Sequence, residues 1–256
     1  MEVHHHSHTA RKKWTHYFWE FLMLFLAVFC GFMAENIREH KIEQHRAHDF
    51  AKSLVKDLQS DISSLNIHQK TSEKYIVLTD SLLEGSKKNL EGRNATEFSF
   101  YTRFIYWTGP ISWNRSTFEQ IKNSGSLRYF KNYQLLEKIM KYEAVVNETE
   151  GEYINHMTRG NMLLNLINQI IDPAFHHDLS TYRLTSFDSI PVNTRENFLT
   201  ANVESLEKKR EKIREMLNMA IVQQRNLRFS IDTRLVPAKE LANELISELK
   251  KEYHLE

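Results

Sequence analysis

Residues 18–34 read FWEFLMLFLAVFCGFMA, and this stretch decides how the rest of the chain is organised. Its seventeen residues carry a single charge, on Glu20. Together with Tyr17 they form an apolar run that, as a helix, is about 27 Å long, close to the roughly 30 Å hydrocarbon core of a bilayer. We therefore predict one membrane-spanning helix over residues 14–34. A tail, residues 1–13, precedes it and one water-soluble domain, residues 35–256, follows it.

The flanks of the apolar run indicate its orientation. Basic residues come first, followed by tryptophan and tyrosine rings of the kind that lie at the level of the lipid headgroups. The predicted interface residues are Arg11, Lys12, Lys13, Trp14, Tyr17 and Trp19. The far flank, residues 35–46, mixes both signs of charge. The positive-inside rule therefore favours, by a small margin, an N-terminus in the cytoplasm and the remaining chain outside.

Three other interpretations of the apolar run stay open. A cleaved signal peptide ends in a small-x-small site, and residues 29–34, FCGFMA, offer a poor one. A lipoprotein has a small residue before its cysteine, whereas Phe29 precedes Cys30. A buried helix of a soluble protein would not need the observed order of basic, aromatic and apolar residues. These observations together favour an uncleaved anchor.

At 100° per residue, the predicted membrane helix has two different faces. The first bears the only acid and the small residues: Glu20, Leu24, Ala27, Gly31 and Ala34. The second consists of Phe18, Phe21, Phe25, Phe29 and Phe32. In lipid, small residues let helices approach closely, and an ionisable group is expected to face protein. We expect the first face to pack on another transmembrane helix and the second to face lipid. In the alternative, Glu20 only reaches the cytoplasmic interface.

The composition narrows the classes of function. A formal net charge of +1, with 26% charged residues, gives no strong field that would attract nucleic acid or acidic substrates. Glycine and proline are few, at 7 and 4, which is typical of long helices. Cys30 is the one cysteine, so no disulfide within one chain is possible.

Apolar spacing predicts an all-α fold. From Phe32 to Glu84 there is neither glycine nor proline, so the membrane helix should continue into a long stalk helix that ends near Gly85. The apolar stripe of this stalk needs cover from other helices or from a second copy in a coiled coil. The other helices of an antiparallel bundle are predicted over 117–123, 134–171, 194–231 and 239–253. A capping box of Thr117 and Gln120 should open the first of these, and Pro237 should end the 194–231 helix. Residues 85–117 and 173–193 are expected to be irregular.

The predicted irregular segment contains the densest group of aromatic residues outside the apolar run. Its tyrosine and tryptophan residues, which carry a polar group on the ring, are Tyr101, Tyr106, Trp107 and Trp113. Packing in the core is the first interpretation of this group. A surface that binds a partner is the second, because exposed aromatic residues mark contact sites.

No motif for catalysis is present. The sequence has no Gly-x-Ser-x-Gly, Walker loop or dinucleotide fingerprint. His40 and His45 lie about 140° apart on a helix and cannot share a metal as i, i+4 histidines do. Two further sets of possible metal ligands are His45 with His48 and Asp49, and His176 with His177 and Asp178. Both are weak candidates, because the first is typical of a solvated helix surface and the second lies in a predicted loop. We therefore predict that the protein is not an enzyme, uses no cofactor and does not bind nucleic acid.

The N-terminal tail contains four closely spaced histidines, His4, His5, His6 and His8. Short histidine-rich segments can bind a transition metal. In the other interpretation, these histidines and the basic residues of the tail lie against anionic lipid headgroups.

Several stretches resemble a known family. They are HHHSH (residues 4–8), KKWTHYFWEFLMLFLAVFCGFMAENIREH (12–40), TFEQIKNSGSLRYFKNYQLLEKIMKYE (117–143) and LANELISELKKEYHL (241–255). The family consists of single-pass inner-membrane proteins of Gram-negative bacteria and is catalogued as a domain of unknown function. The resemblance implies an anchor in the bacterial inner membrane, with residues 35–256 in the periplasm. It implies no activity and no catalytic residues.

We expect a membrane-anchored, oligomeric helical scaffold or interaction protein. Its partners would be the lipid bilayer and either a second copy of the chain or another membrane protein. The first alternative is a subunit of a channel or proton-driven transport complex that uses Glu20. The second is a periplasmic metal-binding protein or enzyme.

Overall fold

The computed structural model describes residues 14–201 and 203–255. Within these ranges the chain is helical without strands, so the predicted all-α class is confirmed. The chain divides into two units, residues 1–50 and residues 51–256. The first helix, α1 (Trp14–Gly85), contributes residues to both units. The predicted uninterrupted helix up to Gly85 is confirmed, because no glycine or proline before Gly85 weakens its hydrogen-bond ladder beyond Phe32.

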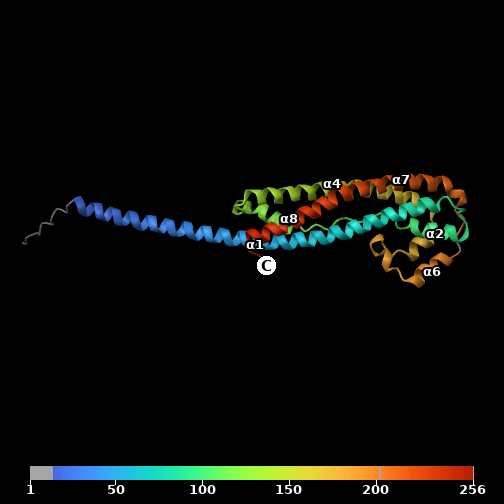
Figure 1. The fold of residues 1–256 in the computed structure, drawn as a ribbon, viewed down its shortest axis with the longest axis horizontal. Helices are drawn as coiled ribbons and strands as arrows, with labels where there is room; N and C mark the ends of the chain where they lie inside the picture. Colours follow the sequence, from blue (N-terminus) through green and yellow to red (C-terminus); the bar gives the residue numbers. More distant parts are fainter. Residues whose placement is uncertain (1–13, 202, 256) are drawn as a thin grey trace, which may run out of the picture. The chain divides into compact units, whose positions relative to one another are not determined.

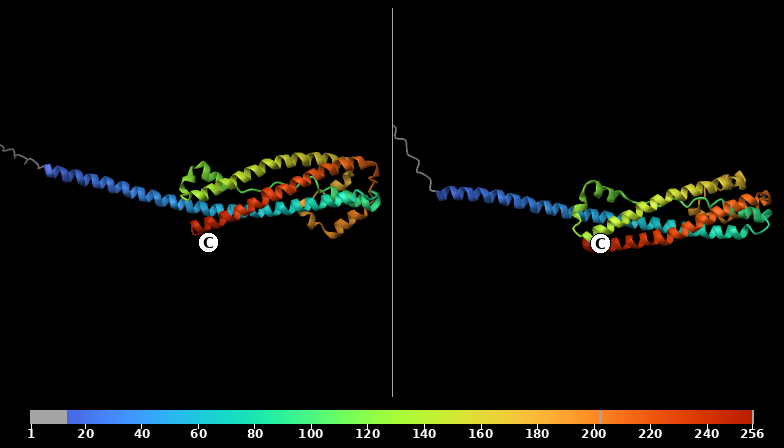
Figure 2. Two further views of the ribbon diagram at one scale, coloured as in Figure 1. Left: turned by 45° about the horizontal axis from the view of Figure 1, so that its top comes forward. Right: turned by 90° about the horizontal axis from the view of Figure 1, so that it is seen from above.

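The second unit is a bundle of long helices (Figures 1 and 2). α4 (Tyr133–Ile170) packs against α7 (Arg210–Ser230) and α8 (Val236–Glu252). In both figures α7 and α8 run opposite to α4 and to the part of α1 beyond residue 51. The main core cluster includes Tyr75, Leu82, Leu163, Ile167, Ile170 and Leu217. The predicted antiparallel bundle and the predicted 134–171 helix are therefore confirmed.

Short helices lie beside the long ones at the end of this unit near Gly85 (Figure 1). They are α2 (Gly92–Thr102), α5 (Pro173–Asp178) and α6 (Val192–Thr200), with a 3-10 turn, η2 (Leu184–Ser189). The expectation that residues 85–117 and 173–193 are irregular is wrong for these elements. α2 has the sequence GRNATEFSFYT, in which helix formers are weak, but it buries Phe98 and Phe100 and packs against α6. Tertiary packing, not intrinsic propensity, therefore forms this helix.

The predicted helix over 194–231 is interrupted in the structure. α6 ends at Thr200, and a 3-10 turn, η3 (Glu207–Lys209), precedes α7. Two hydrogen bonds with Leu90, in the α1–α2 connection, hold this break. Leu206 N–H donates to the Leu90 carbonyl at 3.0 Å, and Leu90 N–H donates to the Glu207 carboxylate at 2.6 Å. The break is therefore stabilised by distant residues, and no glycine or proline marks it.

The prediction that Pro237 ends a helix is wrong. α7 continues through a π-helical turn, η4 (Ile231–Leu235), directly into α8, and Pro237 lies in the first turn of α8. A proline removes one backbone N–H and crowds the carbonyl four residues earlier. The wider π turn occupies that position, so the chain passes the proline without a loop.

The connector between α2 and α4 contains the predicted short helix, which appears as α3 (Ser116–Asn123). Gly125 follows it at φ 68°, a left-handed conformation that glycine adopts without strain. A 3-10 turn, η1 (Ser126–Tyr129), then leads to Asn132, whose side chain accepts the Leu135 N–H at 3.2 Å and caps α4.

Candidate functional site

The part of α1 within the first unit contains an apolar stretch without cover from the chain. Among the described residues it belongs to the one helix that is long and apolar enough to cross a membrane, and none of this stretch is buried. Leu24 on the predicted packing face and Phe32 on the predicted lipid face are each 68% exposed. A core helix of a soluble protein would instead bury such side chains.

The two predicted faces of this helix have distinct chemistry. Phe21, Phe25 and Phe29 stack along one side, with ring centroids 6.3 and 6.0 Å apart. Glu20 lies 3.0 Å from His16 Nε2, and a Cβ atom added at Gly31 would meet nothing within 4 Å. Cys30 is exposed. Within the chain, the small-residue face is therefore open to a neighbouring helix.

Some predicted residues lie outside the described part of the chain. These are Arg11, Lys12 and Lys13 of the interface group and His4, His5, His6 and His8 of the tail. The side chains of His176 and Asp178 lie outside it as well. His45 and His48 are described, and each lies 3.6 Å from the Asp49 carboxylate. The described residues contain no group of three or more histidine, cysteine or acidic side chains arranged to hold a metal ion.

In the second unit, two buried aspartates of α1 hold the start of α3. Asp57 accepts hydrogen bonds from the Thr117 N–H at 3.1 Å and from Asn114 Nδ2 at 2.8 Å. The first N–H groups of a helix have no partner within it, and a carboxylate there also complements the helix dipole. The predicted capping box of Thr117 and Gln120 is not formed, since Asp57 supplies the cap from another helix.

Asp61, one turn further along α1, completes this arrangement. It accepts the Asn114 N–H at 2.7 Å and the Tyr142 hydroxyl at 2.9 Å. Burial raises the pKa of Asp61, and these two hydrogen bonds act in the opposite direction. The network therefore ties α1, the connector and α4 together.

Arg115, the residue next to Asn114, joins several acids of α3 and α4. Its guanidinium contacts the buried carboxylate of Glu143 and lies 3.0 Å from Glu150 and 3.5 Å from Glu119. It also donates to Asn147 Oδ1 at 2.9 Å. A planar guanidinium has five donors, so one arginine can serve several oxygen atoms.

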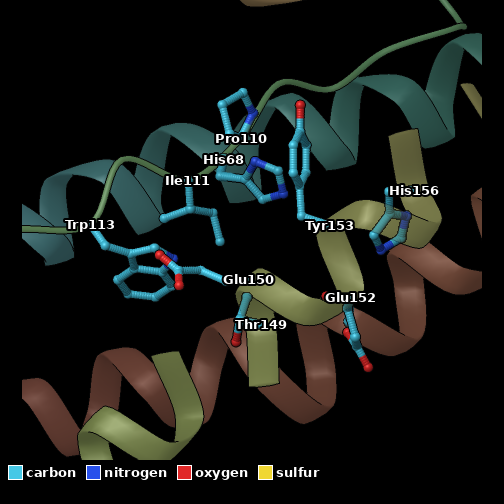
Figure 3. Close-up of a pocket in the computed structure, with 10 residues that line it drawn as sticks. His68, Pro110, Ile111, Trp113, Thr149, Glu150, Glu152, Tyr153 and His156 are labelled. Atoms are coloured by element: carbon cyan, nitrogen blue, oxygen red, sulfur yellow. The ribbon is translucent and has the colours of Figure 1, made fainter. Parts of the chain in front are cut away.

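A cavity of about 180 Å³ lies beside this network (Figure 3). Four segments far apart in the sequence contribute its walls. They are α1 with His68, the connector with Pro110, Ile111 and Trp113, α4 with Thr149, Glu150, Glu152, Tyr153 and His156, and α7 with Ser230. In the view of Figure 3, the Glu150 carboxylate overlaps the Trp113 ring, and His68 is seen between Ile111 and Tyr153.

The two histidines of the cavity are uncharged at neutral pH. Burial, together with a smaller effect of the nearby His156, lowers the pKa of His68 to about 4. Burial and Arg159 also lower the pKa of His156, whose Nδ1 lies 3.0 Å from Gln223 Nε2. Both imidazoles therefore offer hydrogen-bonding nitrogens without positive charge.

Of the four aromatic residues singled out in the sequence, Trp113 alone lines this cavity. Trp107 supports it, because its Nε1 donates to the Tyr153 hydroxyl at 2.9 Å. Tyr106 lies under the Arg103 guanidinium, and Tyr101 accepts a hydrogen bond from Arg195 at 2.5 Å. All four are partly buried, so the group combines core packing with accessible edges.

Sequence reasoning missed the remaining cavity residues and the aspartate pair. Asp57 and Asp61 lie four residues apart on the same stripe as Leu54, Leu58 and Leu65. Acids on a buried stripe are a signal that could have been found from periodicity. His68 and His156 had no such signal, since no local pattern relates residues on two separate helices.

Comparison with protein-family models, with curated proteins and with solved structures gave no match. The resemblance to an inner-membrane family therefore stays a prediction.

Proposed function

We propose that this protein is a membrane-anchored helical scaffold or interaction protein without catalysis of its own. The observation that carries the proposal is the apolar stretch of α1, which the chain leaves uncovered. Exposing so many large apolar side chains to water is unfavourable by about 25 cal/mol per Å². Lipid, together with a neighbouring helix, would remove this exposure. Residues 51–256 have their own core and do not need that stretch to cover it.

We further propose an inner-membrane anchor with a cytoplasmic N-terminus and residues 35–256 in the periplasm. Alkaline phosphatase and a fluorescent protein, each fused after residue 256, test the orientation. We expect phosphatase activity without fluorescence, and a protein that stays in the membrane pellet after alkaline carbonate. The reverse pattern, or release by carbonate, would contradict the anchor or its orientation.

In the proposed assembly, the face of Glu20, Leu24, Ala27, Gly31 and Ala34 packs on a second copy of the chain. Gly31→Leu is a sharp test, because a side chain there meets nothing within its own chain. Any change in assembly size must then come from contact with another molecule. We expect Gly31→Leu and Glu20→Ala to reduce the mass of the full-length protein measured by light scattering in detergent.

Phe25→Leu on the opposite face is the matched control, since the phenylalanine stack faces lipid in this proposal. We expect it to leave the mass unchanged. If neither Gly31→Leu nor Glu20→Ala changes the mass, this face does not hold the assembly.

Proton transport through Glu20 is the second candidate function. One observation favours it: His16 Nε2 lies 3.0 Å from Glu20 Oε1, so two titratable groups meet at the start of the apolar stretch. Proton flux into liposomes that Glu20→Gln abolishes would support this function. Equal flux with and without the protein would rule it out.

A further inference from the structure

The cavity of Figure 3 has the size and the walls of a site for a single-ring ligand. Its volume of about 180 Å³ slightly exceeds that of an engineered cavity of roughly 150 Å³ that binds benzene. Pro110, Ile111 and the Trp113 indole give it an apolar wall, and Tyr153 adds a second ring. A flat apolar ring would therefore fit between these side chains.

Contacts with neighbouring residues fix both rings in place. The Trp113 indole meets the Tyr142 ring edge-on, with centroids 6.4 Å apart and an interplanar angle of 81°. The Tyr153 hydroxyl accepts the hydrogen bond from Trp107 Nε1. Binding would therefore lose little side-chain entropy, because the walls are ordered in advance.

The charges around the cavity are unbalanced. Arg115 contacts the carboxylates of three glutamates, and Arg234 contacts those of two. These five are Glu119, Glu143, Glu148, Glu150 and Glu152. The ten lining residues include neither lysine nor arginine, and the two histidines are neutral. Arg159 lies 3.4 Å from His156 Nδ1, so three arginines stand beside the five glutamates. Acids therefore outnumber arginines by two around this aromatic cavity.

We propose that this cavity binds a small organic ammonium ion with one flat apolar ring. The ammonium group lies against the Glu150 carboxylate, and the ring lies against Trp113 and Tyr153. A carboxylate and the face of an indole both attract a cation, and both do so more strongly where water is partly excluded. A neutral ligand of the same shape would leave the excess of acids uncompensated.

The test is isothermal titration calorimetry of the full-length protein in a non-ionic detergent with benzylammonium chloride. Benzyl alcohol and benzoate serve as neutral and anionic probes of nearly the same shape. We expect one benzylammonium site per chain, at least tenfold weaker binding of benzyl alcohol and no saturable binding of benzoate.

Two variants locate the site. Glu150→Gln keeps the shape of the side chain and should weaken benzylammonium binding at least tenfold. Glu148→Gln is the matched control, because Glu148 also pairs with an arginine but does not line the cavity, and it should change the affinity less than twofold. Ile111→Trp should abolish binding by filling the cavity, and melting curves confirm the fold of each variant.

Equal affinities for benzylammonium and benzyl alcohol would overturn the proposed charge preference. Unchanged affinity in a folded Glu150→Gln variant would overturn the proposed location. Absence of saturable binding of all three probes would overturn the proposal as a whole.

Discussion

A Cβ atom at Gly160 would lie 2.3 Å from the carbonyl oxygen of Tyr106. The backbone that follows α2 therefore rests on α4 at a position without a side chain. Because the same connector continues to Trp113, this contact helps to fix one wall of the cavity.

Gly160→Ala should destabilise the protein by about 1–3 kcal/mol, since a backbone atom must move to admit the methyl group. Gly151→Ala on the same helix is the control. Gly151 is exposed and a Cβ there meets nothing within 4 Å, so alanine should stabilise by about 0.5–1 kcal/mol. Urea unfolding of the full-length protein in detergent, followed by circular dichroism, measures both. Equal effects of the two substitutions would contradict the close contact.

Tyr142→Phe should cost about 1.5–3 kcal/mol, because it removes the hydroxyl that donates to the buried Asp61 carboxylate. The ring, and with it the packing against Trp113, is kept. Tyr133→Phe lies on the same helix and is 80% exposed in the wild type, so its effect should stay below about 0.5 kcal/mol. Urea unfolding in detergent measures both variants. If Tyr142→Phe leaves the free energy of unfolding unchanged, the hydrogen bond contributes nothing to stability.

Arg115→Met should cost about 3–5 kcal/mol, because it leaves the buried Glu143 carboxylate without its cationic partner. Glu119→Gln removes the longer, 3.5 Å contact to the same arginine and should cost less than about 1 kcal/mol. Thermal unfolding in detergent compares the two variants. A larger loss for Glu119→Gln would contradict the central role of the Glu143 pair.

Acidic pH should lower the free energy of unfolding, because His68 is neutral in the folded protein. Burial lowers its pKa from 6.5 to about 4 in the folded state, so between these values the unfolded chain binds a proton that the folded chain does not. The contribution of the neutral His68 to the free energy of unfolding is therefore fully present above pH 6.5, and it is lost as the pH falls toward 4. The loss at pH 5 is about 2 kcal/mol.

His68→Gln removes this component, so its unfolding free energy should change less between pH 7.5 and pH 5 than that of the wild type. His254→Gln replaces an exposed histidine near the C-terminus and should keep the wild-type pH dependence. An identical pH dependence in wild type and His68→Gln would show that His68 titrates normally.

The long helices were predictable because their signals are local. The absence of glycine and proline from Phe32 to Glu84 predicted where α1 ends, and apolar spacing predicted α4 within one residue at each end. The break after Thr200 was not predictable in this way, since it depends on hydrogen bonds between Leu206 or Glu207 and Leu90. The π turn before Pro237 was not predicted either. A proline indicates that a helix is disturbed, but it does not indicate whether the helix ends or continues through a wider turn.

The sequence did not predict the candidate cavity; of the residues that it singled out as a possible partner surface, Trp113 alone lines it. Its walls come from four segments, and helical periodicity describes each helix alone without saying which residues of two helices meet. The aspartate pair was predictable only in part. Asp57 and Asp61 stand on a buried stripe and can be recognised there, but their partners Asn114, Thr117 and Tyr142 appear only in the folded chain.

Cys30 offers a spectroscopic handle that needs no engineering. It is the one cysteine in the sequence and its side chain is exposed within the apolar stretch of α1. A nitroxide attached there would report, by its relaxation with dissolved oxygen against a water-soluble nickel chelate, how deep this residue sits in a vesicle. Dipolar broadening between two such labels would give the spacing of neighbouring copies in the same sample.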